Sequence, residues 1–153
     1  MLPDLYLPTH RLHDLYDAHG ALLAEFDFFP EPKLLYVRWH GHLTAAAVIE
    51  GTQAAMRLRH AGEAPRLLLN DKSLTSGDWS EALPWLQYEW LPEVAKAGLL
   101  AVGYVYSPDP TSQNGSQDFI KAVRLVLPLS VFHAAAPAWK WLLRRGGGGQ
   151  ELT

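Results

Sequence analysis

The densest group of side chains that could do chemistry lies in residues 71–78, within the stretch RLLLNDKSLTSGDW (66–79). Carboxylates and hydroxyls surround one glycine there, and the candidate regulatory residues are Asp71, Ser73, Thr75, Ser76 and Asp78. A phosphate on Ser76 would lie beside the start of the next helix, where free N–H groups and the helix dipole favour an anion. The pattern predicts a surface loop at the carboxyl end of a strand, with Asp71 ending that strand and Asp78 capping the next helix.

The same loop also has a purely structural interpretation. Serine and glycine are ordinary turn formers, and Asp78 followed by Glu81 three residues later has the form of a capping box. A third interpretation makes the loop the rim of a small-ligand site. The residues alone leave these three readings open.

Two histidines form the second candidate group. His40 and His42 are two residues apart, and such residues share one face of a strand, so both imidazoles could hold one metal ion. A metal site needs a third ligand, and the other five of the seven histidines follow no ligand spacing. Because the chain has no HExxH motif either, we expect neither a bound metal nor a cofactor.

The aromatic stretch DWSEALPWLQYEWLP (78–92) is the third candidate. One set of its residues recurs at helical intervals and predicts a core-facing stripe: Trp79, Leu83, Leu86 and Trp90. Trp85 and Tyr88 lie on another face. They either cover a second side of the core or form an outward surface that binds a partner or a ligand.

Recognisable catalytic motifs are absent from the sequence. The chain has no cysteine, which excludes thiol catalysis and disulfides. It has no GxSxG elbow and no glycine-rich phosphate loop before a helix. Its carboxylates form no pair recognisably placed for acid–base work. We therefore expect a protein that is not an enzyme.

The elements that must position these residues change character along the chain. Two strands around a turn at residues 18–20, and a third at 34–39, predict an N-terminal β-meander. Helices and strands then alternate as α-β-α-β-α-β-α: helix 45–62, strand 66–70, a helix from 78, strand 99–107, helix 117–127, strand 129–132 and helix 135–145. This order predicts an α/β fold with a mixed sheet and helices packed on it.

Two of those strands carry apolar runs without alternation. Strands 66–70 and 99–106 therefore need cover on both faces, and a helix between them can supply a crossover connection. We expect these two strands to be adjacent, parallel and central in the sheet.

Length and composition indicate one domain. The chain has 153 residues, of which 48% are hydrophobic and 19% charged. We assign the domain to residues 1–145, with an extended arm at 1–9 and a flexible glycine-rich tail at 146–153. The net charge of -3 argues against nucleic acid as a partner. No apolar run predicts membrane insertion and no leader pattern is visible, so we expect a cytoplasmic protein.

Four stretches carry a resemblance to a known family: LLYVRWHGHLT (34–44), LLLNDKSLTSGDW (67–79), YEWLPEVAKAGLLAVGYVYS (88–107) and VFHAAAPAWKWL (131–142). In order and hydrophobic pattern, roughly residues 20–143 resemble the STAS family, which has the anti-sigma-factor antagonist fold. The resemblance is to small single-domain bacterial proteins of STAS-like type.

The resemblance implies a regulatory site. In regulatory STAS domains a strand ends in an acidic residue, and a Ser-Ser-Gly turn, phosphorylated by a partner kinase, opens the next helix. Asp71 would match the acidic residue, and residues 75–77 (Thr-Ser-Gly) would loosely match the turn. Leu74 stands where the family has an aspartate before the turn, and Asp78 follows the glycine instead.

Our reading from the sequence is a non-catalytic regulatory or protein-interaction domain of STAS-like type. It would act through loop 71–78 and the following helix, on a protein partner of unknown identity, and it could form a homodimer. The alternative is a small-molecule or lipid-binding carrier with a pocket near the aromatic helix 79–90. An unrecognised enzyme is the least favoured. A deep apolar cavity lined by Trp85 or Tyr88 would favour the carrier, a protruding Ser76 the regulator, and converging ionisable groups the enzyme.

Overall fold

The structure is a computed structural model, which describes residues 9–58 and 62–148. The predicted arm at 1–9 therefore lies outside the described residues except for Thr9, and so do residues 149–153 of the predicted tail. No helix within the described ranges is long and apolar enough to cross a membrane.

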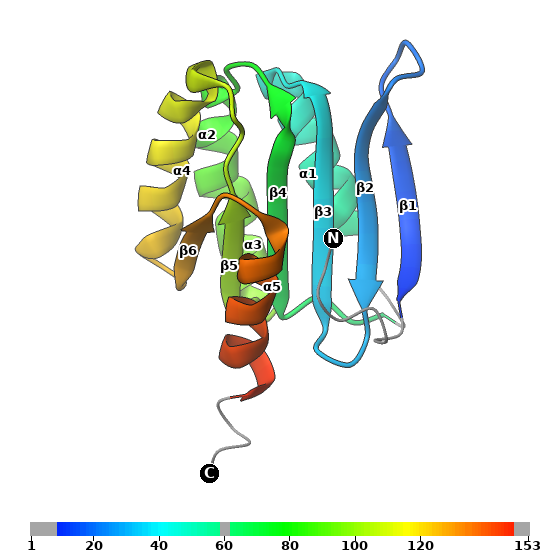
Figure 1. Cartoon of the computed structure of the whole chain (residues 1–153), viewed down its shortest axis with the longest axis vertical. Coiled ribbons are helices and arrows are strands. Elements are labelled where there is room, and N and C mark those ends of the chain that lie inside the picture. The colour runs from blue at the N-terminus through cyan, green and yellow to red at the C-terminus, as the bar shows by residue number, and fades with distance from the viewer. Residues whose placement is uncertain (1–8, 59–61, 149–153) are drawn as a thin grey trace.

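One six-stranded mixed sheet forms the centre of the fold (Figure 1). Its strands are β1 (His10–Tyr16), β2 (Leu22–Phe29), β3 (Leu34–His42), β4 (Leu67–Ser76), β5 (Ala101–Val105) and β6 (Leu129–Phe132). They lie side by side in chain order. The first three are antiparallel, and β3 to β6 are parallel. The α/β fold with a β-meander is confirmed, and so is the prediction that strands 66–70 and 99–106 are adjacent and parallel. They were expected to be central; both are internal, with β5 next to the edge strand β6.

Helices cover the two faces of the sheet unequally. The longer ones are α1 (Ala45–Arg57), α3 (Leu91–Lys96), α4 (Gln113–Arg124) and α5 (Ala135–Leu143). Between β4 and α3 the chain forms η1 (Ser80–Ala82), α2 (Leu83–Trp85) and η2 (Leu86–Trp90), and η3 (Pro110–Ser112) precedes α4. Parallel strands β3 to β6 are added in one direction, and right-handed crossovers then put every connecting helix on the same face of the sheet. The connecting helices α1, α2–α3 and α4 therefore lie behind the sheet in Figure 1. Helix α5 follows the last strand and lies in front.

The sheet separates two hydrophobic cores. The larger core lies under α1, α2–α3 and α4, and the smaller one lies under α5. Alternation along β4 divides its residues between them: Leu67 and Leu69 face α5, whereas Leu68 packs against the larger core. By the same alternation, Asn70 and Lys72 face the larger core.

Strand β4 is longer than the sequence indicates, and the predicted loop at 71–78 is wrong for most of its length. The strand continues to Ser76, so Asp71 lies within it and not at its end. The cause is the neighbouring strand: β3 extends to His42 and pairs with Leu74, Thr75 and Ser76 in parallel register. Backbone hydrogen bonds from β3 therefore hold the polar residues extended.

The chain after α5 also differs from its prediction. The tail was expected to be flexible from residue 146, but the π-helical turn η4 (Arg144–Gly148) continues α5. Gly146 packs so tightly on Leu67 that a Cβ in its place would overlap that side chain. Glycine permits this close approach, and the helical chain extends three residues beyond residue 145, where the sequence predicts its end.

Candidate functional site

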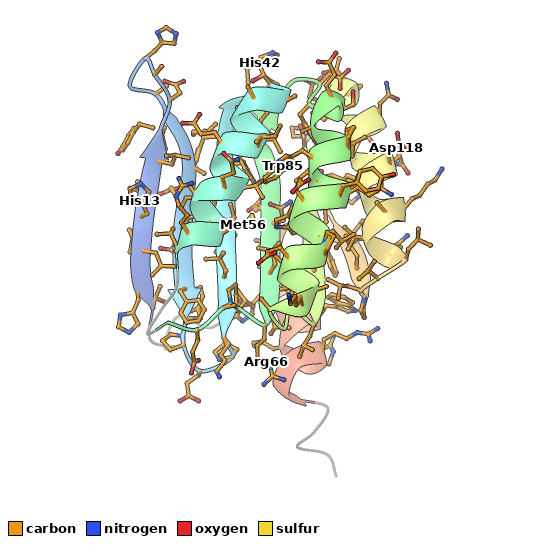
Figure 2. All side chains as sticks on the ribbon, turned by 180° about the vertical axis from the view of Figure 1, so that it is seen from behind. His13, His42, Met56, Arg66, Trp85 and Asp118 are labelled. Carbon is orange, nitrogen blue, oxygen red and sulfur yellow. The ribbon has the colours of Figure 1, made fainter. Side chains whose placement is uncertain are left out.

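A pocket of about 570 Å³ opens between α1 and the helical segment 85–97, above β3 and β4. Met56 on α1 and Trp85 at the end of α2 lie in the space between these two helices in Figure 2. Its volume falls within the range typical of small-molecule sites, roughly 300–1,000 Å³. A pocket near the aromatic helix 79–90 is what the hypothesis of a small-molecule or lipid-binding carrier predicts.

Apolar side chains from several parts of the chain line most of the pocket. They include Leu35, Val37 and Trp39 of β3, Val48, Ala55 and Met56 of α1, Leu68 of β4, Trp85, Leu86, Trp90 and Val94 of the helical segment, and Phe119 of α4. Alternation along β3 places its three residues on one face. Gly51 lets α1 approach this face closely, because a Cβ there would overlap the ring of Trp39.

Lys72 is the buried ionisable residue of the pocket lining. Only 2% of its surface is exposed. Its side-chain nitrogen lies 3.3 Å from the centroid of the Trp79 ring, 5.6 Å from that of Trp39 and 5.8 Å from that of Tyr104. These distances fit cation–π contacts, which extend to about 6 Å. Three aromatic rings thus surround the amine at one end of an otherwise apolar space.

No carboxylate or other polar group pairs with the side-chain amine of Lys72 within the described part of the chain. Burial lowers the pKa of the Lys72 amine well below its ordinary range, since an apolar site disfavours the charged form. Unpaired buried lysines are rare because each costs free energy on folding. Such a group marks a site where a ligand can supply the missing partner.

Asn70 provides a second polar group two residues earlier on the same face of β4. Its side-chain oxygen accepts a hydrogen bond of 2.6 Å from Nε1 of Trp39. Because the indole nitrogen can only donate, this bond fixes the orientation of the amide. The amide nitrogen of Asn70 is then a donor without a partner among the described residues, and Asn70 lines the pocket.

The other ionisable residues of the pocket lie at its surface. Arg57, Glu89 and Glu93 line it and are exposed to solvent. They are not gathered around Lys72, so the pocket offers one amine and one amide rather than an acid–base pair. This arrangement suits recognition of a polar group on an apolar molecule.

Proline explains the irregular wall of the pocket. The sequence predicts one helix from residue 78, but the chain forms a short turn from Ser80 and then widens into the π-helical turn η2. Pro92 has no N–H and its ring crowds the carbonyl four residues earlier, which disfavours regular α-helix here. In the wider turn the N–H of Leu91 bonds to the oxygen of Leu86, and Trp90 remains buried against the core.

The candidate regulatory residues of 71–78 are held in place by neighbouring groups. Asp71 is buried and accepts hydrogen bonds from the Tyr36 hydroxyl at 2.9 Å and from the Ser73 N–H at 2.9 Å. Thr75 is buried and donates to the Lys72 carbonyl at 2.7 Å. Asp71 faces the α5 side of the sheet, away from the pocket. Burial, and then the Asp71 carboxylate, raise the pKa of Tyr36.

Ser76 and Asp78 lie at the end of the same segment. Ser76 is half-buried and its hydroxyl lies 3.1 Å from Nδ1 of His42. Asp78 is exposed and accepts from the Ser80 N–H at 2.9 Å. The cap position of η1 is Trp79, without a side-chain cap bond, so Asp78 stabilises the turn before η1 instead of forming the predicted helix cap. Ser73 is also half-buried, and both serines lie on β4 instead of on the predicted surface loop.

Residues 107–112 brace the end of β4. The Ser107 hydroxyl donates to the Thr75 carbonyl at 2.7 Å, and the Ser112 hydroxyl donates to the Gly77 carbonyl at 2.6 Å. The Asp109 carboxylate accepts from the Gly77 N–H at 2.8 Å, and this bond holds the pKa of Asp109 below its ordinary value. Gly77 has a φ of 100°, which favours glycine at this turn.

The two histidines of the metal hypothesis have separate partners. His40 Nε2 lies 2.8 Å from a Glu25 oxygen on β2, whereas His42 contacts Ser76 on β4. Gly41 between them has a φ of 83°, which departs from regular strand geometry. The described residues contain no group of three or more His, Asp or Glu side chains placed to hold a metal. The absence of bound metal remains a prediction.

Trp85 and Tyr88 differ in environment. Trp85 is half-buried, packs against the larger core and lines the pocket. Tyr88 is 69% exposed and does not line it. The expected stripe of Trp79, Leu86 and Trp90 is buried in the core, with Leu83 half-buried beside it.

Sequence reasoning missed Lys72 and Asn70 as site residues. Residues 70–72 (Asn-Asp-Lys) read as the polar end of a strand. The signal that could have identified them is the period of β4, because residues two apart share a face and Leu68 is apolar. Recognising it requires knowing that the strand continues beyond residue 70.

No protein-family profile, curated protein or solved structure matches this chain. The STAS resemblance is neither supported nor contradicted by these comparisons and stays a prediction.

Proposed function

We propose that this domain binds a small apolar molecule in the pocket between α1 and residues 85–97. The observation that carries the proposal is an apolar space of about 570 Å³ that contains a buried, unpartnered Lys72. A protein without a ligand gains no stability from keeping such a space and such an amine. A ligand would fill the space and pair with the amine of Lys72.

Nile red, a neutral apolar dye, tests this proposal through its fluorescence. The dye is expected to bind the wild-type protein with one site per chain. Ala55 on α1 lines the pocket and is half-buried, so Ala55→Phe should fill part of the space and weaken dye binding. Ala46→Phe is the matched control, since Ala46 is exposed on the same helix and does not line the pocket. Equal dye binding by both variants would contradict the proposal.

The second candidate is the regulatory or protein-interaction role expected from the STAS resemblance. One observation favours it: Leu74 is 61% exposed, two residues before Ser76 on the part of β4 that extends beyond β5. A protein partner could cover this leucine, and a phosphate on Ser76 would change the charge beside it. Ser76→Asp should then change the affinity for that partner, while Ser76→Ala should not.

A further inference from the structure

The inner end of the pocket has the features of a site for an anionic group. Lys72 is almost fully buried and lines the pocket, and its side-chain amine has no hydrogen-bonding or ionic partner among the described residues. The aromatic rings around its nitrogen present only weakly negative faces. A buried ammonium normally has an oxygen anion beside it. This chain does not provide one.

Asn70 defines which anion would fit. Its amide nitrogen is a second donor on the same face of β4, two residues from Lys72. A carboxylate has two oxygens and only accepts hydrogen bonds, so it offers one acceptor for each of the two donors. The remaining walls are apolar and suit a hydrocarbon body.

We propose that the pocket selects an apolar monocarboxylic acid, whose carboxylate accepts hydrogen bonds from Lys72 Nζ and Asn70 Nδ2 while its hydrocarbon part lies between α1 and α3. This inference rests on the function proposed above, and it names the ligand class of that site. Lys72 and Asn70 are binding residues, and no covalent step is involved.

Binding of the acid should take up a proton. Burial lowers the pKa of Lys72 in the free protein, and a bound carboxylate would raise it again because the opposite charge favours the ammonium. The other ionisable groups facing this space are Arg57 of α1, Glu89 of η2, Glu93 of α3 and Tyr104 of β5. Burial raises the pKa of the Tyr104 hydroxyl, which lies 2.7 Å from the Ser116 hydroxyl. Burial lowers the pKa of Lys72 and raises that of Tyr104, so Lys72 is the group whose charge we expect the bound carboxylate to change.

Calorimetric titration with decanoate and decanol tests the ligand class, because the two probes share a tail and differ in the head group. At neutral pH the wild-type protein should bind decanoate at least about 10-fold more tightly than decanol, as expected for a hydrogen bond to a charged group. Above the pKa of Lys72, decanoate affinity should fall by up to about 10-fold per pH unit. Decanol affinity should not change with pH.

Two variants separate the head-group site from the apolar space. Lys72→Met keeps a long side chain without charge, so decanoate should lose about 10- to 100-fold in affinity while decanol binding persists. Asn70→Asp keeps the acceptor for Trp39 and gives Lys72 an internal carboxylate, so it should also weaken decanoate alone. Lys96→Met is the control, because Lys96 is exposed on α3 and its loss changes the net charge equally.

The outcomes distinguish this inference from the proposed function. If neither decanol nor decanoate binds the wild-type protein and Nile red does not bind either, the pocket is not a ligand site and both proposals fail. If the two probes bind equally, or if Lys72→Met weakens both by the same factor, the pocket binds apolar molecules but the carboxylate assignment is overturned. Proton uptake with decanoate that persists in Lys72→Met would also overturn it.

Discussion

The side-chain nitrogen of Lys72 lies 3.3 Å from the centroid of the Trp79 ring, at the inner end of an apolar pocket. Trp79 is fully buried in the larger core. The contact therefore holds an amine between the sheet and its helices, where burial disfavours its charged form. Its consequences for stability, pH dependence and ligand binding can be measured separately.

Lys72→Met should stabilise the free protein. The substitution removes a buried amine that makes no hydrogen bond in the described structure and replaces it with an apolar chain of similar shape. The free energy of unfolding at neutral pH is expected to rise by about 1–3 kcal/mol, the usual cost of an unsatisfied buried polar group. Urea unfolding measures this change. Lys96→Met should stay within about 0.5 kcal/mol of wild type, and a destabilised Lys72→Met would mean that the amine has a stabilising partner.

The stability of the wild-type protein should increase with pH relative to Lys72→Met. The pKa of Lys72 is lowered in the folded state, whereas in the unfolded chain it is about 10.4. Between these values the unfolded state binds more protons, so raising the pH favours folding. The stability gap between variant and wild type should therefore narrow as the pH rises from the lowered pKa of folded Lys72 to about pH 10. A constant gap would show that Lys72 titrates normally.

Above about pH 10 the ionisation of two buried tyrosines should lower the stability of the protein, which opposes the effect of Lys72. Burial raises the pKa of Tyr36 and of Tyr104, so both hydroxyls ionise more readily in the unfolded chain. Stability should therefore fall once the pH exceeds about 10. Because both tyrosines are unchanged in Lys72→Met, the comparison between the two proteins isolates the contribution of Lys72.

Gly51→Ala should destabilise the protein although alanine is the better helix former. In an unconstrained helix interior the change would gain about 1 kcal/mol. Here the new Cβ would overlap the Trp39 ring, whose indole donates to Asn70. Overpacking of this kind costs about 1–3 kcal/mol. Thermal unfolding measures the result, with the exposed Glu50→Ala on the same helix as a control. A stabilised Gly51→Ala would show that α1 can move away from β3.

Thr44→Ala should weaken the start of α1, which forms one wall of the pocket. The Thr44 hydroxyl accepts a hydrogen bond of 3.1 Å from the Ala47 N–H, and its loss should cost about 1 kcal/mol. Thr44→Ser retains the acceptor and should behave like wild type in the same urea titration. If the two variants unfold at one midpoint, the cap contributes nothing measurable.

Ser76→Ala should change stability by no more than about 0.5 kcal/mol, because the one hydrogen bond of the Ser76 hydroxyl within the described residues is with the exposed His42 side chain. Asp78→Ala should lower the melting temperature, since Asp78 accepts from the Ser80 N–H at the start of η1. Differential scanning calorimetry of both variants tests whether Asp78→Ala melts at a lower temperature than Ser76→Ala. Unfolding caused by Ser76→Ala alone would show that the end of β4 depends on that hydroxyl.

Local patterns in the sequence were sufficient to predict most of the elements. The unalternating apolar runs identified the two internal parallel strands, because a strand covered on both faces needs apolar residues at successive positions. Strand 129–132 and the start of helix 135 were predicted at their observed positions. The Thr44 cap was also visible, since capping depends on residues within one turn. These features are decided by neighbours in the chain.

Contacts between distant segments decided the length of β4 and the burial of Lys72. The polar residues after Asn70 remain in a strand because β3 pairs with them, and that partner lies more than thirty positions earlier in the chain. The burial of Lys72 depends on α1, the segment 85–97 and α4 closing over one face of β4. A lysine after an aspartate predicts solvent exposure when only its neighbours are considered. The sequence by itself thus determined the fold class and the aromatic stripe, whereas only tertiary packing placed an unpaired amine at the inner end of a pocket.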